Sequence, residues 1–536
     1  MQAVQRLLQR IERLNAIGSA LSAERNTDRL VERILQGAKE LTHADGGTLY
    51  TRQGEQHLAF SVVLNDTLGI VLGGSEAEAV PFEPLPLYDP QGRPNHHNVA
   101  AYAALEGVTV NIPDAYEAHG FDFSGTREMD TRTGYRSQSF LTVPMRNHEG
   151  ELLGVLQLIN ALNEHGQPAP FSFEDQSLAE SLASQAAVTL TQQQLIDAQR
   201  ELFESFVKLI AKAIDEKSPH TSGHCQRVPE LTMAFAQAVN ASRQGCYADF
   251  AFSPEQLYEL HIAAWLHDCG KITTPNEIME KATKLQTIMD RIDLVDLRFE
   301  VIRRDFEIAR LRERLAEHEQ PEVPAEAAPA EQQLEADRQF LRHCNIGGEF
   351  MPPPEQARVA QIAQAYRWRD ADGAERPLLT DDELQNLTIP KGTLTDAERQ
   401  IINDHIVVTI DMLEKLRYPR YLAQVPALAG GHHERMDGRG YPKGLRGEEN
   451  PLGARVMAIA DIFEALTAAD RPYKQAKTLS ETMGILLRMR QNGHIDPDLF
   501  EVFVRERVYL TYAEQFLQPE QIDTVDDAAL LAQAAA

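Results

Sequence analysis

The hydrophobic pattern of this chain changes its period once, and this change constrains the fold more than any other feature. From Gly46 short apolar runs with strand-like spacing are bounded by turn residues, whereas from Leu202 to the end the pattern is helical with few strand signals. The predicted strands are Thr48–Arg52, His57–Leu64, Ser139–Arg146 and Leu152–Asn160. The 536 residues also exceed the about 250–300 at which a single core stops growing. The sequence therefore predicts a multidomain protein, in which an α/β domain with an antiparallel sheet precedes an all-α domain.

Helices enclose the predicted strands on both sides. Asn26-Thr27-Asp28 has the composition of a helix cap and predicts a helix over Arg29–Leu41. Asn147–Gly150 is a turn that predicts a hairpin between the last two strands. A helix over Phe173–Arg200, continuing toward Phe206, closes this part. A further helix with a coiled-coil-like seam is predicted at the N-terminus by the spacing of Val4, Leu7, Ile11, Leu14, Gly18 and Leu21.

A second seam lies inside the all-α part. A strict alternation of three- and four-residue steps from Leu285 to Ala309 predicts one long amphipathic helix. The Pro/Ala/Glu-rich stretch Glu319–Glu331 predicts a flexible turn or linker, after which Gln332–His343 predicts a helix that folds back. Two interpretations remain open for this seam: a dimer interface, or packing within the chain against Gln332–His343. The Ala-rich C-terminal residues 516–536 are expected to be a disordered tail.

Charge and cysteine content restrict the partners and the compartment. The net charge of −28 disfavours nucleic acid and anionic membrane surfaces, so an anionic substrate requires local cations or metals. Four cysteines without paired spacing favour a reducing compartment. The N-terminus has arginines and glutamines where a signal peptide needs an apolar core, and no apolar run is long enough to cross a bilayer. We therefore expect a cytoplasmic protein without a membrane span.

The helical part contains histidines and carboxylates in the combination that a two-metal hydrolase requires. Such a site needs neutral imidazoles as terminal ligands and a carboxylate that bridges both ions. Any one of these residues alone is better explained as a surface or core side chain; their occurrence together makes the metal interpretation specific. The candidates are His224, His267, Asp268, His405, His432, His433 and Asp461.

Residues 25–195 resemble a GAF sensory domain. Gly134–Ser137, which leads into Phe140–Met145, is similar to GAF domains of cyclic-nucleotide phosphodiesterases. Those domains often carry an Asn-Lys-Phe-Asp-Glu signature; Asn160, Phe173 and Asp175 match it, and Ala161 stands where the lysine would be. The resemblance implies either a small-molecule ligand or a ligand-free module for dimerisation and sensing.

Residues 202–284 and 390–515 resemble the HD-GYP family. The matching motifs are Leu266–Ile272, His432–Pro442, Ala460–Thr467, Arg471–Lys474 and Gly493–Pro497. The resemblance implies an all-helical HD-type fold and a metal-dependent phosphodiesterase that opens cyclic di-GMP to linear pGpG, and sometimes onward to GMP. Residues 285–390 interrupt the match as an insertion.

The resemblance also implies residue roles. Asp268 would bridge two divalent ions as the catalytic carboxylate, with the other candidates as terminal ligands. Iron or manganese is favoured, with zinc, nickel, cobalt and magnesium left open. His220 stands where some members have a glutamate that supports a third metal, so two ions are expected, with His220 as an extra ligand candidate. Lys271, Arg471 and Lys474 would bind the substrate, Lys271 also acting in catalysis, while the rim would be shaped by Gly440, Tyr441 and Pro442.

The predicted organisation is an N-terminal helix (1–24), the GAF-like domain (25–195), a linking helix (196–210), the catalytic domain (202–515, with the insertion) and the tail. We expect a homodimer whose GAF-like domain regulates hydrolysis of cyclic di-GMP. Two rival functions are a catalytically weak cyclic-dinucleotide receptor and an HD phosphohydrolase that acts on another nucleotide.

Overall fold

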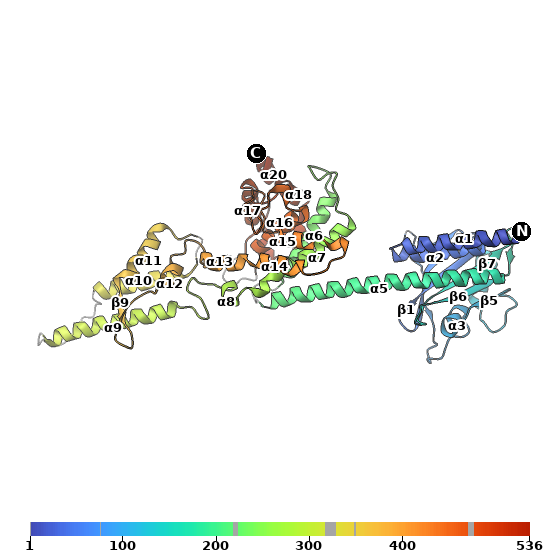
Figure 1. The fold of residues 1–536 in the computed structure, drawn as a ribbon, viewed down its shortest axis with the longest axis horizontal. Coiled ribbons are helices and arrows are strands. Elements are labelled where there is room, and N and C mark those ends of the chain that lie inside the picture. Colours follow the sequence, from blue (N-terminus) through green and yellow to red (C-terminus); the bar gives the residue numbers. More distant parts are fainter. Residues whose placement is uncertain are drawn as a thin grey trace. The chain divides into compact units, whose positions relative to one another are not determined.

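The computed structural model describes residues 2–75, 77–217, 223–316, 329–347, 350–469 and 476–535 (Figure 1). The chain divides into two compact units, Met1–Leu202 and Phe203–Ala536. Helix α5 (Phe173–Lys217) begins in the first unit and ends in the second. No helix among the described residues is both long and apolar enough to cross a membrane.

The first unit is built on one antiparallel sheet with the strand order β3-β2-β1-β7-β6-β5. Its centre is the pairing of β1 with β7, in which Gly47 lies opposite Leu158. All four predicted strands are confirmed to within four residues at their ends, and the turn Asn147–Gly150 joins β6 to β7, as predicted. The strands are β1 (Ala44–Gln53), β2 (His57–Asn65), β3 (Ile70–Gly73), β4 (Leu85–Pro86), β5 (Val110–Ile112), β6 (Phe140–Arg146), β7 (Leu152–Leu162) and β8 (Pro168–Ala169).

Helices cover both faces of this sheet because successive strand residues point to opposite sides. Leu49 packs in the core formed with α1 (Gln2–Ala23), α2 (Thr27–Thr42) and α5, whereas its neighbour Tyr50 packs toward α3 (Val99–Glu106). Helix α4 (Ser124–Thr133) precedes β6. The predicted helices at the N-terminus and after Asn26 are confirmed, and the Asn26 side chain accepts a hydrogen bond from the Arg29 N–H as the cap.

Two residues of the expected GAF signature have structural partners. The Asn160 amide accepts hydrogen bonds from the backbone N–H groups of Gln138 (2.7 Å) and Ser139 (3.1 Å). Asp175 forms an ion pair with Arg10 of α1. Both contacts hold the ends of the sheet and of α5 in place.

The second unit is helical, as predicted, and its main core includes the buried rings of Phe235, Phe463, Phe500 and Phe503. Its principal helices are α6 (His224–Ala241), α7 (Pro254–Leu266), α8 (Asn276–Met279), α13 (Asp396–Asn403), α14 (His405–Glu414), α15 (Val425–Gly430), α16 (Leu452–Thr467), α17 (Leu479–Gln491), α18 (Pro497–Arg505), α19 (Val508–Phe516) and α20 (Asp527–Ala535). Short 3₁₀ helices are η1 (Cys269–Thr273), η2 (Arg420–Leu422), η3 (Gly447–Glu449) and η4 (Pro519–Gln521).

The insertion forms a helical subdomain with a core of its own. The prediction of one helix from Leu285 to Ala309 is wrong at its start, because α9 spans Ile292–Ala316. The Leu285 N–H donates to the Asn345 side chain (2.8 Å) instead of entering a helix, and Ile288 is 94% exposed. The other elements are α10 (Pro329–Asn345), α11 (Pro353–Ala365), β9 (Arg367–Arg369), β10 (Glu375–Pro377) and α12 (Asp381–Leu387).

Helix α10 folds back on α9, so packing within the chain is the interpretation that the structure supports for this seam. Val295 and Phe299 are buried, and Arg338 of α10 forms an ion pair with Asp296 of α9 (2.9 Å). Most of the predicted linker Glu319–Glu331 lies outside the described residues, and its last three residues belong to α10.

The prediction of a disordered C-terminal tail is wrong. Helix α20 packs against α17 and α18, and Ala534 is buried in the main core. Asp527 accepts hydrogen bonds from Arg507 and Tyr509, which fixes the start of the helix. All four cysteines are free, as the sequence predicts.

Candidate metal centre

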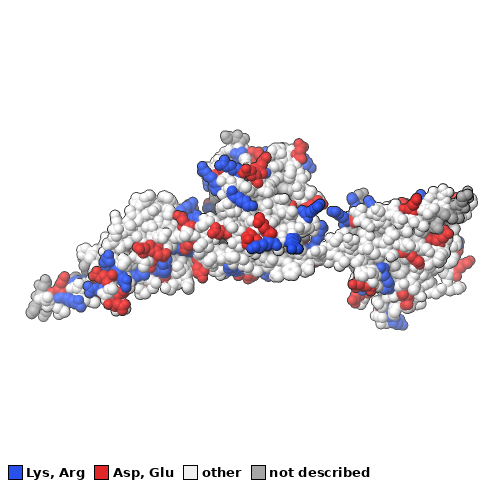
Figure 2. All heavy atoms as spheres, in the orientation of Figure 1, with Lys and Arg blue, Asp and Glu red and all other residues white. Residues whose placement is uncertain are grey.

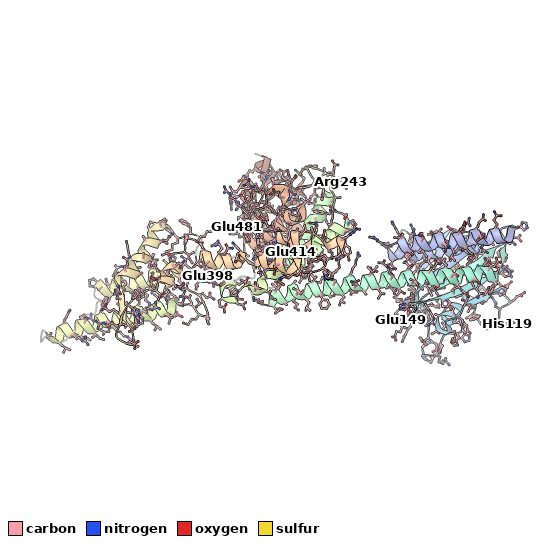
Figure 3. All side chains as sticks on the ribbon, viewed as in Figure 1. His119, Glu149, Arg243, Glu398, Glu414 and Glu481 are labelled. Atoms are coloured by element: carbon pink, nitrogen blue, oxygen red, sulfur yellow. The ribbon has the colours of Figure 1, made fainter. Side chains whose placement is uncertain are left out.

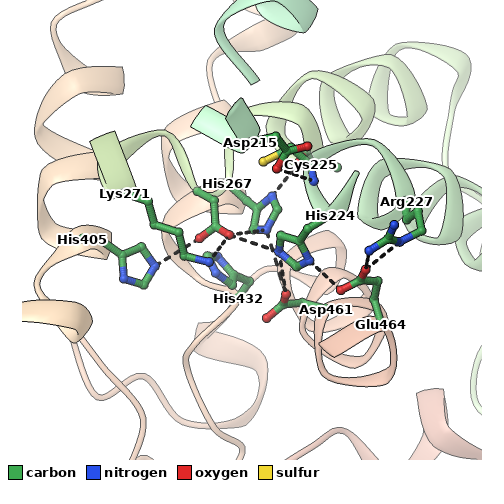
Figure 4. Close-up of polar contacts among 12 residues, drawn as sticks. Asp215, His224, Cys225, Arg227, His267, Lys271, His405, His432, Asp461 and Glu464 are labelled. Atoms are coloured by element: carbon green, nitrogen blue, oxygen red, sulfur yellow. Dashed lines mark hydrogen bonds and ion pairs between the residues drawn. The ribbon is translucent and has the colours of Figure 1, made fainter. Parts of the chain in front are cut away.

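The second unit brings the predicted metal ligands together from five separate segments (Figure 4). His224 is the first residue of α6, and His267 and Asp268 follow the last turn of α7. His432 and His433 follow α15, and Asp461 lies in the middle of α16. His405 is the first residue of α14, which follows α13 after Asp404. Helix ends present most of these side chains, so packed helices fix their positions.

Three of the histidines share one orientation. Their Nδ1 atoms lie within hydrogen-bond distance of the carbonyl oxygen three residues earlier: His267 at 2.7 Å, His405 at 2.5 Å and His432 at 2.6 Å. An Nδ1–H that donates to a carbonyl leaves the lone pair on Nε2. Among the described residues, these three Nε2 atoms are buried without a hydrogen-bond partner. Buried orphan nitrogens that converge on one place are donor atoms suited to a metal.

The fourth histidine, His224, uses a carboxylate instead of a carbonyl. Its Nδ1 lies 2.6 Å from Glu464 Oε2, and the other oxygen of Glu464 accepts from Arg227 Nη2 (2.6 Å). Glu464 is 1% exposed. Sequence reasoning missed Glu464 and Arg227; their positions three residues after Asp461 and three after His224 were the available signal.

Asp268 stands between two groups of ligands. Its Oδ2 lies 3.2 Å from Nε2 of both His224 and His267, and its Oδ1 lies 3.2 Å from Nε2 of His405. Asp461 joins the first group, with Oδ1 3.4 Å from His224 Nε2. The second group consists of His405, His432 and His433, whose donor atoms lie within 4.8 Å of one another. One carboxylate thus faces both groups with different oxygens, which is the arrangement of a bridging ligand.

Two candidate ligands of the second group have lowered pKa values. Burial and the neighbouring His267 lower the pKa of His432 to about 4, and burial and His432 hold the pKa of His433 well below its usual value. Both rings are therefore neutral at pH 7, as metal ligands must be. Burial opposes ionisation of Asp268, but Lys271 and His267 outweigh it and hold its pKa well below the usual range.

Lys271 lies at the same centre. Its ammonium is 2.5 Å from Asp268 Oδ2, and its side chain is 24% exposed. The pKa of Lys271 is raised, because the carboxylates of Asp268 and Asp461 outweigh the effect of burial. A permanent cation therefore borders the buried carboxylates and reaches solvent.

Gly270 allows the two ligand groups to approach. A Cβ at this position would lie 2.0 Å from the carbonyl oxygen of His405 and 2.6 Å from the backbone nitrogen of Thr409. The Gly270 N–H donates to Thr409 Oγ1 (2.9 Å). The turn that carries Asp268 thus packs directly on the helix that begins with His405.

The Gly-Tyr-Pro segment lies beside the second group. The Tyr441 ring stacks on the His433 ring, with centroids 4.8 Å apart and an interplanar angle of 24°. A Cβ on Gly440 would meet the Cα of Glu434 at 2.5 Å, so a glycine is needed there. Glu434, which is buried, accepts hydrogen bonds from the backbone N–H groups after Pro442 and holds this loop. Three other candidates, His220, Arg471 and Lys474, lie outside the described residues.

Two parts of the chain match known protein families. Residues 26–190 match the GAF domain family, and residues 379–499 match the HD domain family. Residues 26–190 are therefore similar to GAF domains and residues 379–499 to HD domains. The matched residues 379–499 contain His405, His432, His433 and Asp461, whereas the candidate ligands His224, His267 and Asp268 lie outside them.

Curated relatives match the chain over short regions. A 3'3'-cGAMP-specific phosphodiesterase 1 of Vibrio cholerae is 49% identical over 77 residues, covering 14% of this chain and 18% of the relative. A probable cyclic di-GMP phosphodiesterase of the same organism is 33% identical over 141 residues, covering 25% and 32%. The cyclic di-GMP phosphodiesterase response regulator RpfG of Xanthomonas campestris is 36% identical over 126 residues, covering 23% and 32%. The chain thus spans less than a third of the length of each of these relatives.

The GAF domain also has similar solved structures. One is the GAF domain of a phosphoenolpyruvate-protein phosphotransferase from Coxiella burnetii, 14% identical, covering 36% of this chain and 98% of that chain with a TM-score of 0.25.

Proposed function

We propose that the HD domain is a metal-dependent phosphodiesterase that hydrolyses cyclic di-GMP to pGpG, or onward to GMP. The observation that carries this proposal is the position of Asp268, whose two oxygens face two separate groups of histidines; the Nε2 atoms of His267, His405 and His432 are buried without a hydrogen-bond partner. A receptor needs no such arrangement for binding alone, so hydrolysis is the better explanation.

Two divalent ions fit this set of donors. His224, His267 and Asp461 would hold one ion and His405, His432 and His433 the other, with Asp268 shared. When bound, such a pair lowers the pKa of a water molecule toward about 7 and neutralises charge on phosphoryl oxygens. Histidine and carboxylate ligands favour iron or manganese here, and the same donors accept zinc, nickel and cobalt.

The chain must attract a dianionic substrate against its own net charge of −28. On the face drawn in Figure 2, basic and acidic side chains are interspersed, so attraction has to be local. Lys271 supplies a partly exposed cation at the centre, and we assign substrate binding to it and to Arg471 and Lys474. Tyr441, stacked on His433, would form the rim with Gly440 and Pro442.

The second candidate substrate is 3'3'-cGAMP. The relative with the highest identity among those compared above carries that specificity in its name. Both substrates are cyclic dinucleotides with two phosphodiester bonds, so the metal centre serves either one. Base recognition decides between them.

The test is hydrolysis of each dinucleotide by anaerobically purified protein with its metal content measured. Wild type should open cyclic di-GMP, and Asp268→Ala should lose hydrolysis together with metal. Asp411→Ala is the matched control, because Asp411 is exposed on α14 and pairs with Lys415 only four residues away. Wild-type turnover by Asp268→Ala with two metals bound would contradict the proposal. Exclusive hydrolysis of 3'3'-cGAMP would establish the second substrate.

We further propose that the GAF domain, with or without a small-molecule ligand, regulates this activity in a parallel homodimer. Helix α5 carries an exposed apolar residue at every seventh position: Val188 (62%), Leu195 (64%), Leu202 (58%) and Leu209 (62%). This repeat is typical of a two-helix coiled coil. Sedimentation at micromolar concentration tests it: wild type should be dimeric and Leu195→Glu/Leu202→Glu monomeric, whereas a monomeric wild type would refute it.

A further inference from the structure

The last turns of α5 are part of the core of the second unit. Val207, Ala211 and Ile214 of this helix are each at most 5% exposed and belong to the same core as α6 and α7. The end of α5 thus packs in the same core as the helices that present the candidate ligands. Two of its last three residues, Asp215 and Lys217, reach two main-chain segments next to the candidate metal centre.

Lys217 binds the turn that follows Asp268. Its ammonium donates to the carbonyl oxygens of Ile272 (2.5 Å) and Thr274 (2.7 Å), and it lies 3.3 Å from that of Lys271. These carbonyls lie at the end of the 3₁₀ helix η1, where a cation is favourable; that of Lys271 also accepts from the Thr274 N–H (3.1 Å). An ammonium has three donors, which matches three carbonyls.

Asp215 binds the N-terminal end of a helix, α6. Its carboxylate accepts from the backbone N–H of Gly223 (3.1 Å) and lies 3.4 Å from that of Cys225. These groups flank His224 at the start of α6, and the cap residue Gly223 has no side chain with which to cap its own helix. Asp215 therefore supplies from α5 the carboxylate that the N-terminus of α6 lacks. Figure 4 shows Asp215 beside Cys225 and His224.

The two segments meet at the metal centre. One carries His224, the other Asp268 and Lys271, and His224 Nε2 lies 3.2 Å from Asp268 Oδ2. A displacement of the end of α5 would therefore move the start of α6 and the turn after Asp268, because hydrogen bonds join both to α5. We propose that Asp215 and Lys217 are positioning residues that set the distance between His224 and Asp268.

This inference rests on the proposed function and names the route of its regulation. Helix α5 is continuous from Phe173, at the edge of the GAF domain, to Lys217. A rotation of α5 would pull Asp215 and Lys217 in the same sense, since they lie two residues apart. The GAF domain would thereby control the geometry of the ligands rather than access to them.

The test compares metal affinity in the full chain, with Mn²⁺ as the probe and a competing chelator. Lys217→Met and Asp215→Ala remove the contacts, and Lys212→Met and Glu216→Ala are matched controls, because both residues are exposed on the same turns of α5. We expect about tenfold weaker Mn²⁺ binding in the first pair, as for other groups that orient metal ligands, and wild-type affinity in the controls. Lys217→Arg keeps donors for the carbonyls and should restore affinity.

Thermal unfolding without metal separates positioning from folding. If Lys217→Met or Asp215→Ala fails to fold, Lys217→Gln and Asp215→Asn, which keep part of each contact, take their place with an intermediate loss expected. Mn²⁺ affinity equal to that of the controls in all these variants would overturn the inference. Absence of Mn²⁺ binding and hydrolysis in wild type would instead overturn the proposed function.

Discussion

Replacement of Glu464 by glutamine should weaken metal binding although Glu464 contacts no metal in the proposed centre. Its two carboxylate oxygens serve two donors: Oε2 accepts from His224 Nδ1 at 2.6 Å, and Oε1 accepts from Arg227 Nε at 2.8 Å. A glutamine has the same shape but only one oxygen. In Glu464→Gln one of the two donors therefore faces an NH₂ group in a site where water is excluded.

The magnitude follows from these contacts. Loss of a partner that orients a metal-binding histidine typically costs 10–100-fold in affinity, which is about 1.4–2.8 kcal/mol. A buried hydrogen bond that involves a charged group contributes about 1.5–3 kcal/mol to folding. Glu464 is 1% exposed and Arg227 17%, so solvent screens this contact little. We expect a loss of about 2 kcal/mol in the free energy of unfolding.

The assay is Mn²⁺ competition with a chelator, together with urea unfolding of the metal-free protein. Glu414→Gln is the control, because Glu414 is exposed at the end of α14 and undergoes the same chemical change (Figure 3). Arg227→Gln leaves the acceptor for His224 in place, so it should reduce stability more than metal affinity. Mn²⁺ affinity of Glu464→Gln within twofold of wild type would refute the reasoning.

Three further outcomes are expected. Gly270→Ala would place a Cβ 2.0 Å from the His405 carbonyl oxygen, so α14 must move away and the two-ion stoichiometry measured by metal analysis should fall; two bound ions would contradict this. Mn²⁺ at a hundred times its dissociation constant should add about 2.7 kcal/mol to the free energy of unfolding of wild type and nothing to that of Asp268→Ala, measured by urea unfolding. Seven residues inserted after Gln199 should preserve the phase of the α5 seam and the response of hydrolysis to the GAF domain, whereas four residues should abolish that response; equal activities would argue against transmission through α5.

Local patterns in the sequence predicted the elements whose structure depends on near neighbours. Asn26 caps α2 and the turn Asn147–Gly150 closes its hairpin as expected, because both signals act over three or four residues. The start of α9 could not be predicted from periodicity, since Asn345, sixty residues away, binds the Leu285 N–H. Helix α20 was missed for a similar reason: Leu530, Leu531 and Ala534 pack in a core that other helices of the second unit form.

In the candidate metal centre, too, local motifs indicated some residues, whereas groups that act from distant parts of the chain were missed. Motifs singled out His267 and Asp268 as candidates because a motif is a local string of letters, and the structure brings them together with the other described candidates. Glu464 acts from a helix far along the chain, and Lys217 acts on main-chain carbonyls, which exist at every residue and leave no trace in the sequence. Sequence therefore predicts the donors better than the groups that orient them.

The insertion separates His267 and Asp268 from His405 in the sequence, although all three residues lie in one site. Its two ends are fastened together at buried lysines: Lys281 donates to Asn386 of α12 and to Glu398 of α13, each at 2.8 Å, and Lys284 donates to the carbonyl oxygen of Ile389 at 2.8 Å. The chain therefore leaves the HD domain and returns to it at one place. An insertion with adjacent ends and its own core adds little strain to the domain that holds it, since a longer closed loop costs only slightly more entropy. The distance between Asp268 and His405 is thus set by the contact of Gly270 with α14 and not by the length of chain between them.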